Sequence, residues 1–192
     1  MTAAPSVAVC DYGAGNIRSV IVALRRLGSE VTVTADPGTI LRERLAVLPG
    51  VGSARSAMTA LRERGIDQAL RERTATGRRT LGICLGLQLA MEWSDEDGGV
   101  ECLGILPGRM TRIAAERVPR MGWARVEPWG EAYYFAHSYA AETSAVLAVS
   151  EGLTAAAGNE VFTGLQFHPE KSGPAGGRLL RHWLIDDLRV TV

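Results

Sequence analysis

The sequence predicts an α/β protein with a mixed central sheet and helices on both faces. Short runs of apolar and β-branched residues alternate with segments of helical periodicity in the first half of the chain. Strands that alternate with helices of this length form parallel sheets covered on both sides. After about residue 108 short strand-like segments dominate, which predicts mixed or antiparallel additions to the sheet. With 192 residues and no linker, repeat or low-complexity tract, we expect one domain over residues 1–192.

Strands and helices follow one another in the first half. The helix over Ile17–Leu27 is the clearest, because its apolar residues share one face and Gly28 follows as a left-handed cap. A second helix is predicted over Leu85–Trp93, directly after a buried strand. The other predicted elements are strands over Ser6–Cys10, Glu30–Thr34, Leu45–Leu48 and Thr80–Ile83, and helical segments over Arg55–Leu61 and Ile66–Thr74.

The second half reads as short strands followed by one closing helix. The closing helix is amphipathic, with an apolar stripe formed by Leu179, Leu180, Trp183, Leu184 and Leu188. The predicted strands are Arg109–Ile113, Trp123–Glu127, Tyr133–His137, Ala145–Val149 and Val161–Phe167.

Composition excludes several classes of function. The formal net charge is zero, so there is no long-range field for nucleic acid or acidic membranes. No apolar run of about 18 residues or more exists, and the N-terminus has no charged stretch leading into an apolar one. We therefore expect a soluble, cytoplasmic chain. The three cysteines cannot all pair and lack the spacing of metal ligands, so we expect free thiols, no metal and no cofactor.

A nucleophile turn is predicted around Cys84. Glycines stand two residues before and two after it, in Gly82-Ile83-Cys84-Leu85-Gly86, where a buried strand turns into a helix. The helix N-terminus favours a thiolate, and its free N–H groups, that of Leu85 above all, can stabilise an oxyanion. An inert buried cysteine is the alternative, but the flanking glycines favour the nucleophile.

The general base is sought among three histidines. His182 lies beside the apolar stripe of the closing helix, which favours a packing or surface role. His137 ends an aromatic strand but has no carboxylate before Glu142. His168 also ends a strand, and Glu170 follows it across Pro169, so that the carboxylate can turn back and orient the imidazole. His168 with Glu170 is therefore the favoured pair, against the alternative of a strand-end His beside a solvated Glu.

Taken together, these segments resemble the class I glutamine amidotransferases, which carry a Cys-His-Glu triad on a flavodoxin-like fold. The resemblance covers nearly the whole chain, and it is closest to the members that pass ammonia to a separate (β/α)₈ cyclase in histidine biosynthesis. The segments that carry it are Asp11-Tyr12-Gly13-Ala14-Gly15-Asn16 with Ser19-Val20, Pro49-Gly50-Val51-Gly52 with Ala57-Met58, the Cys84 turn with Gln88-Leu89, Met121-Gly122-Trp123, His137-Ser138-Tyr139 and Gln166-Phe167-His168-Pro169-Glu170-Lys171-Ser172-Gly173. Ala54 and Ala124 depart from the usual pattern, which has an aromatic residue and an Asn at these positions.

The resemblance implies a role for each matching residue. Cys84 would attack the side-chain amide of L-glutamine, His168 would protonate the departing ammonia and then activate water, and Glu170 would orient His168. The thioester so formed is hydrolysed to glutamate. Positions implied to hold the amino-acid head are Gly50, Gln88, His137, Ser138 and Tyr139. The alternatives are a polar helix position for Gln88 and aromatic core packing for Tyr139.

The resemblance also implies an oxyanion loop and a partner. Val51 and Gly52 would supply a second backbone N–H opposite Leu85. Glycines flank Val51, so we hypothesise that its peptide can flip and that this donor is not permanently aligned. The partner would be the cyclase, bound as a heterodimer, with Asn16, Arg18 and Trp123 at interface positions. Core packing is the alternative for Trp123. A glutaminase of another pathway, a γ-glutamyl peptidase and a non-catalytic regulatory module are the competing functions.

Overall fold

The central element is a seven-stranded sheet with the order β11-β12-β13-β4-β3-β1-β2. The computed structural model describes residues 5–13 and 17–185. Strands β2, β1, β3, β4 and β13 run parallel to one another. β12 pairs antiparallel with β13, and β11 pairs antiparallel with β12. These strands span Ser6–Cys10 (β1), Glu30–Thr34 (β2), Leu45–Leu48 (β3), Thr80–Ile83 (β4), Val146–Ser150 (β11), Leu153–Gly158 (β12) and Phe162–Leu165 (β13).

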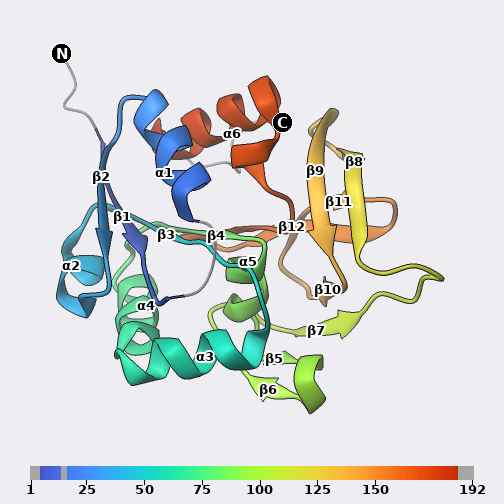
Figure 1. Cartoon of the computed structure of the whole chain (residues 1–192), viewed down its shortest axis with the longest axis horizontal. Coiled ribbons are helices and arrows are strands. Elements are labelled where there is room, and N and C mark those ends of the chain that lie inside the picture. Colours follow the sequence, from blue (N-terminus) through green and yellow to red (C-terminus); the bar gives the residue numbers. More distant parts are fainter. Residues whose placement is uncertain (1–4, 14–16, 186–192) are drawn as a thin grey trace.

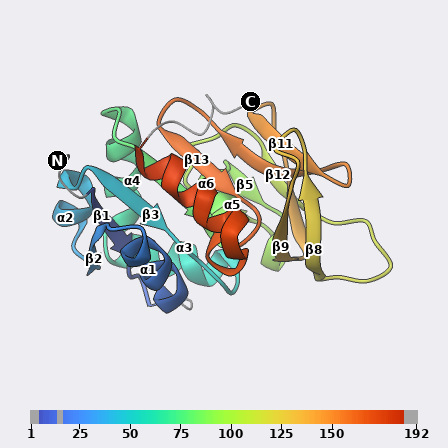
Figure 2. The same cartoon turned by 90° about the horizontal axis from the view of Figure 1, so that it is seen from above.

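Helices cover both faces of this sheet. Figure 1 shows α1 (Ile17–Arg26) and α6 (Gly173–Ile185) above the sheet, with α3 (Ala54–Glu63) and α4 (Ile66–Ala75) below it, and Figure 2 looks down on α1 and α6. Every residue of β3, β4 and β13 is buried, as expected for strands covered on both sides. None of the described helices is long and apolar enough to cross a bilayer.

Most of the predicted elements of the parallel half are confirmed. The four strands predicted there have the observed bounds, and Gly28 has a φ of 86° at the end of α1, as a left-handed cap requires. One helix was not predicted: α2, Pro37–Arg42. Asp36 caps it by accepting a hydrogen bond from the Thr39 N–H (2.7 Å), and Pro37 takes the first helical position. A capping residue followed by proline is a sequence signal for the start of a helix, so α2 could have been predicted.

The prediction that a helix runs from Leu85 to Trp93 is wrong in its length. Helix α5 (Leu85–Ala90) ends early, and Trp93 belongs to a short strand, β5 (Trp93–Ser94). The carbonyl of Leu89 accepts from the Leu103 N–H (2.8 Å), and that of Ala90 accepts from residues 105 and 106. A distant segment thus takes the place of the next helical turn.

Only some of the strands in the second half of the chain join the seven-stranded sheet. β11, β12 and β13 do so, but β10 (Tyr139–Glu142), β7 (Arg109–Arg112), β5 and β6 (Val100–Glu101) form a separate four-stranded sheet. The 3₁₀ turn η1 (Glu96–Gly98) lies between β5 and β6. β8 (Arg120–Val126) and β9 (Glu131–His137) pair only with each other, as an antiparallel ribbon standing beside α6 (Figure 1). The expectation that all these strands extend the central sheet is therefore wrong.

A buried arginine joins the layers at the end of the sheet opposite the thiol. Arg73 of α4 is fully buried, and its guanidinium donates to the carbonyls of Ile40 (2.7 Å), Glu43 (2.6 Å) and Arg44 (2.9 Å). It also donates to the carbonyl of Arg79 (2.9 Å). Burial lowers the pKa of Arg73 to about 10, which leaves the group charged at neutral pH. One side chain thus satisfies carbonyls of α2 and of the two connections that lead into β3 and β4.

Candidate active site

Cys84 occupies a strained position between β4 and α5. Its φ of 53° and ψ of −106° are rare for a residue with a side chain, and α5 begins at the next residue. The Cys84 N–H donates to the carbonyl of Leu165 at the end of β13 (2.7 Å), which fixes the corner to the neighbouring strand. The thiol therefore sits at the carboxyl edge of the parallel strands, where α/β proteins assemble their sites.

The glycines beside Cys84 allow the chain to pass close to its neighbours. A Cβ on Gly86 would overlap the carbonyl oxygen of Leu48 in β3. A Cβ on Gly82 would lie 2.7 Å from both the Gly86 backbone and the ring of Phe162. The structure thus gives the predicted turn and a steric reason for each glycine.

His168 and Glu170 form a buried pair. The backbone N–H of His168 donates to the carbonyl of Tyr134 in β9 (2.9 Å). The short turn η2 (Pro169–Lys171) then brings Glu170 back toward the imidazole ring. His168 Nδ1 and Glu170 Oε1 are 2.8 Å apart, and both side chains are 4% exposed. The predicted orientation of His168 by Glu170 across Pro169 is therefore present in the structure.

The environment of His168 favours its charged form. Burial alone would lower its pKa, but hydrogen bonds to Cys84 and Glu170, together with their negative charge, outweigh burial and raise the pKa to about 9. The ring thus lies between the thiol and the carboxylate. This is the arrangement in which an imidazolium stabilises a thiolate.

These groups open into a cavity of about 300 Å³. It brings together the predicted nucleophile and base and all but one of the residues assigned to the oxyanion site and the substrate. The lining residues are Val51, Gly52, Cys84, Leu85, Gln88, Glu96, Pro119, Ala136, His137, Ser138, Tyr139, His168 and Lys171. Gly50 lies behind this wall, where an added Cβ would be 2.5 Å from the Tyr12 hydroxyl and 2.9 Å from Leu85 Cβ.

The loop opposite Leu85 is fixed at both ends. At one end the Tyr12 hydroxyl donates to the carbonyl of Pro49 (2.8 Å). At the other, the Ala54 N–H that starts α3 donates to Glu96 Oε2 (2.7 Å). Between these ends Val51 is 42% exposed, and Gly52 has a φ of 101°, a conformation that side chains rarely adopt.

Three residues in the cavity wall or near the thiol had no role assigned from the sequence. Glu96 projects from η1, and its pKa is raised by burial and by the charge of Asp97, against the hydrogen bond from Ala54. Gln166 is fully buried, and its Nε2 lies 3.8 Å from Cys84 Sγ. Lys171, the one lysine of the sequence, also lines the cavity. Glu96 stands in an acidic, glycine-rich stretch that resembles an ordinary surface turn, so no local signal marked it.

The residues predicted at a partner interface lie on the surface where the structure describes them. Arg18 is exposed on α1, whereas Asn16 falls outside the described residues. Trp123 is 60% exposed on β8, two positions from Met121 at 64%, and its ring contacts that of Tyr134 edge-on. The alternative that Trp123 packs in the core is therefore wrong.

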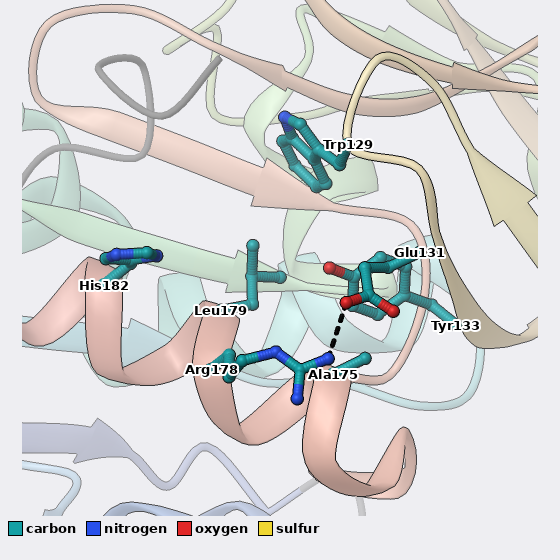
Figure 3. Close-up of a pocket in the computed structure, with 7 residues that line it drawn as sticks. All are labelled: Trp129, Glu131, Tyr133, Ala175, Arg178, Leu179 and His182. Carbon is teal, nitrogen blue, oxygen red and sulfur yellow. Dashed lines mark hydrogen bonds and ion pairs between the residues drawn. The ribbon is translucent and has the colours of Figure 1, made fainter.

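A second cavity, of about 190 Å³, lies between α6 and the β8–β9 ribbon (Figure 3). Its walls are mainly apolar, with an ion pair between Arg178 and Glu131 (2.5 Å). The residues that line it are Trp129, Glu131, Tyr133, Ala175, Arg178, Leu179 and His182. None of the groups around the thiol lines this cavity, so it is separate from the site described above.

Comparisons with known proteins identify the family of the chain. The family described as "Glutamine amidotransferase class-I" matches residues 8–186. The imidazole glycerol phosphate synthase subunit HisH of Exiguobacterium sibiricum is 45% identical over 92% of this chain and 93% of its own length. The subunit of the same name from Carboxydothermus hydrogenoformans is 44% identical over 91% of this chain and 96% of its own.

The fold matches solved structures as well. A crystal structure of a glutamine amidotransferase superposes with a TM-score of 0.78 at 24% identity, covering 93% of this chain and 96% of that one. This likeness shows the fold, and the sequence relatives show the family. The chain belongs to the class I glutamine amidotransferases and, within them, to the HisH subunits of imidazole glycerol phosphate synthase.

Proposed function

We propose that this chain hydrolyses L-glutamine through a thioester on Cys84 and delivers the ammonia, in the cytoplasm, to a (β/α)₈ cyclase subunit of histidine biosynthesis. The observation that carries the proposal is one cavity lined by both a strained elbow cysteine and a histidine paired with a buried carboxylate. The cyclase would use the ammonia to make imidazole glycerol phosphate and an aminoimidazole carboxamide ribotide. The names of the relatives support this pathway.

The first half-reaction forms the thioester. The Cys84 thiolate attacks the amide carbon of glutamine, and the carbonyl oxygen becomes an oxyanion. The Leu85 N–H, the first of α5, is one donor to this oxyanion, and a backbone N–H from Val51 or Gly52 is the second. As the C–N bond breaks, the His168 imidazolium gives its proton to the leaving nitrogen, so the products are ammonia and a γ-glutamyl thioester.

The second half-reaction releases glutamate. Neutral His168 takes a proton from water as the oxygen attacks the thioester carbon, and the same oxyanion donors act again. The C–S bond then breaks, glutamate leaves and the thiolate–imidazolium pair is restored. Glu170 holds the Nδ1 side of the ring throughout, so that Nε2 faces the thiol and the substrate.

The rest of the cavity suits an amino-acid head. Glutamine carries a carboxylate and an ammonium group at one end, and the cavity offers Gln88, Ser138 and Tyr139 as hydrogen-bonding groups. Glu96 adds a carboxylate for the ammonium group. We assign these four residues to holding the head while the side-chain amide reaches Cys84.

The exposed apolar surface on β8 supports a protein partner. Met121 and Trp123 are large side chains left in solvent on one strand, and exposed Trp is a common anchor in protein interfaces. We expect Trp123→Ala to weaken cyclase binding by about 2 kcal/mol, measured by calorimetric titration. Replacing Trp93, which is also exposed (42%) but lies on β5, serves as the matched control.

The test is glutamate release by the chain alone and with its cyclase, for wild type and for Cys84→Ala. We expect release from glutamine that depends on Cys84 and rises when the cyclase is present. Strong activity that needs no partner would contradict the coupled-subunit proposal, and unchanged activity in Cys84→Ala would overturn the mechanism. Preference for γ-glutamyl peptides over glutamine would instead indicate the peptidase alternative.

A further inference from the structure

Arg120 is held by a network of polar contacts beside the glutamine cavity. It is the first residue of β8, and its side chain is only 16% exposed. Its guanidinium lies 4.4 Å from the centre of the Phe135 ring and donates to Ser150 Oγ (2.9 Å) and to Glu151 Oε2 (3.1 Å from Nε). Its Nη1 is 3.4 Å from His137 Nε2. A rigid, planar side chain is thus held by groups from β9 and the β11–β12 turn.

These contacts determine which ring nitrogen of His137 carries the hydrogen and keep the ring neutral. His137 Nδ1 is 2.8 Å from the carbonyl oxygen of Tyr139, which can only accept, so Nδ1 carries the hydrogen. Arg120 can only donate, so Nε2 is the accepting nitrogen. Burial, with the positive charge of Arg120 and of His168 near it, lowers the pKa of His137 to about 4, against the effect of the Tyr139 carbonyl. The ring is therefore neutral, and both of its nitrogens are used within the protein.

The His137 ring consequently holds neighbouring parts of the cavity wall together through its two hydrogen bonds. It ties the end of β9 to the main chain at Tyr139, two residues on, and the Ser138 carbonyl between them accepts from the Ile113 N–H (2.9 Å). The His137-Ser138-Tyr139 turn carries two of the residues assigned above to the amino-acid head. Any loosening of the ring would move these two residues relative to Cys84.

We propose that Arg120 is a positioning residue for glutamine, which acts through His137 to hold the His137-Ser138-Tyr139 turn in its binding geometry. This inference rests on the proposed function. Arg120 does not line the cavity, although its neighbour Pro119 does, so it acts on the substrate through the turn and not by direct contact. The turn binds the head of the substrate and not the amide that reacts, so the effect falls on binding.

The test replaces Arg120 by Met, which keeps the apolar contact with Phe135 but loses every hydrogen bond. We expect KM for glutamine to rise about 10-fold and kcat to stay within about twofold, from the loss of a hydrogen bond to a charged donor. Arg120→Lys keeps the charge without the planar fork and should recover part of the affinity. Arg125→Met is the control, because Arg125 lies on the same strand with its side chain 70% exposed.

A double-mutant cycle separates action through His137 from a general loss of structure. If Arg120 acts through the ring, Arg120→Met adds little to the KM of a His137→Gln variant; full additivity would overturn the inference. Where Arg120→Met fails to fold, Ser150→Ala removes one anchor of the guanidinium and should raise KM about threefold. Unchanged KM in a well-folded Arg120→Met also overturns the inference. The proposed function fails separately, through wild-type protein that does not release glutamate from glutamine.

Discussion

Replacing Glu170 by Gln tests how much the charge of the buried carboxylate contributes. The change keeps the shape of the side chain and an oxygen that can accept from His168 Nδ1, 2.8 Å away. Glu170 Oε2 has no hydrogen-bond partner among the described residues, so an amide nitrogen can replace it without breaking a contact. What is lost is the negative charge, in a site where both side chains are 4% exposed.

The expected size follows from this geometry. A hydrogen bond to a charged group contributes about 1.5–3 kcal/mol and a neutral one about 0.5–1.5 kcal/mol, so the midpoints differ by about 1.3 kcal/mol. That corresponds to about one pKa unit of His168 and about a 10-fold fall in kcat. The pKa of His168 would therefore move down from about 9 toward its ordinary value.

Two assays read this change. The first is kcat for glutamate release between about pH 6 and 10, and the second is the rate of thiol alkylation at Cys84 over the same range. In the wild type the positive charge of His168 is lost as the pH rises through about 9, its raised pKa. In Glu170→Gln this loss should begin about one unit lower.

The free energy of unfolding should also depend on pH through the pairing of His168. The folded pKa of His168 lies above its ordinary value of 6.5, so the pairing stabilises the fold fully below about pH 6.5 and is lost as the pH rises through 9. Denaturant titrations at pH 6 and pH 10 measure this difference, which should shrink in Glu170→Gln. Unchanged kcat and an unchanged alkylation profile would refute the reasoning. Glu63→Gln, at an exposed carboxylate on α3, is the control.

Three further predictions concern the turn, the loop and the core. Gly86→Ala places a Cβ against the Leu48 carbonyl and should cost about 3 kcal/mol in the free energy of unfolding, measured with urea; an unaffected midpoint would contradict the close approach. Gly52→Val strains a φ of 101° and should lower cyclase-stimulated glutaminase activity about 10-fold, whereas full regulated activity would rule out a flipping peptide. Arg73→Met leaves buried carbonyls unpaired and should cost about 4 kcal/mol in urea unfolding, against no measurable loss for the exposed Arg181→Met.

Local sequence signals predicted the parallel half of the fold and the chemical groups around the thiol. The strands are short, buried runs with clear ends, and glycines flank Cys84 because neighbouring backbone passes close to it. His168 and Glu170 could be paired because only one residue, Pro169, separates them. These features are set by contacts within a few residues or by strong steric needs, which a sequence displays directly.

The remaining features depend on contacts between distant segments. Helix α5 stops at Ala90 because residues 103–106 take its last carbonyls, and nothing in Leu85–Trp93 itself records this. Glu96 reaches the cavity because η1 packs against the start of α3, although its own surroundings resemble a surface turn. Arg120 meets His137 only because β8 and β9 pair in one register. Such residues become visible only once the chain is folded.

The two anchors of the Pro49–Ala54 loop limit what kind of switch it can be. Tyr12 holds the carbonyl of Pro49, and Glu96 holds the N–H of Ala54. Ser53 caps α3 by accepting from the Ser56 N–H, so only the three residues from Gly50 to Gly52 are free to rearrange. Three residues held at both ends can rotate a peptide plane but cannot open as a lid. Activation at this loop would therefore consist of the rotation of a peptide plane, which turns an N–H toward the substrate while the overall shape of the molecule stays the same. Probes of individual amides would register it, whereas measurements of overall shape would not.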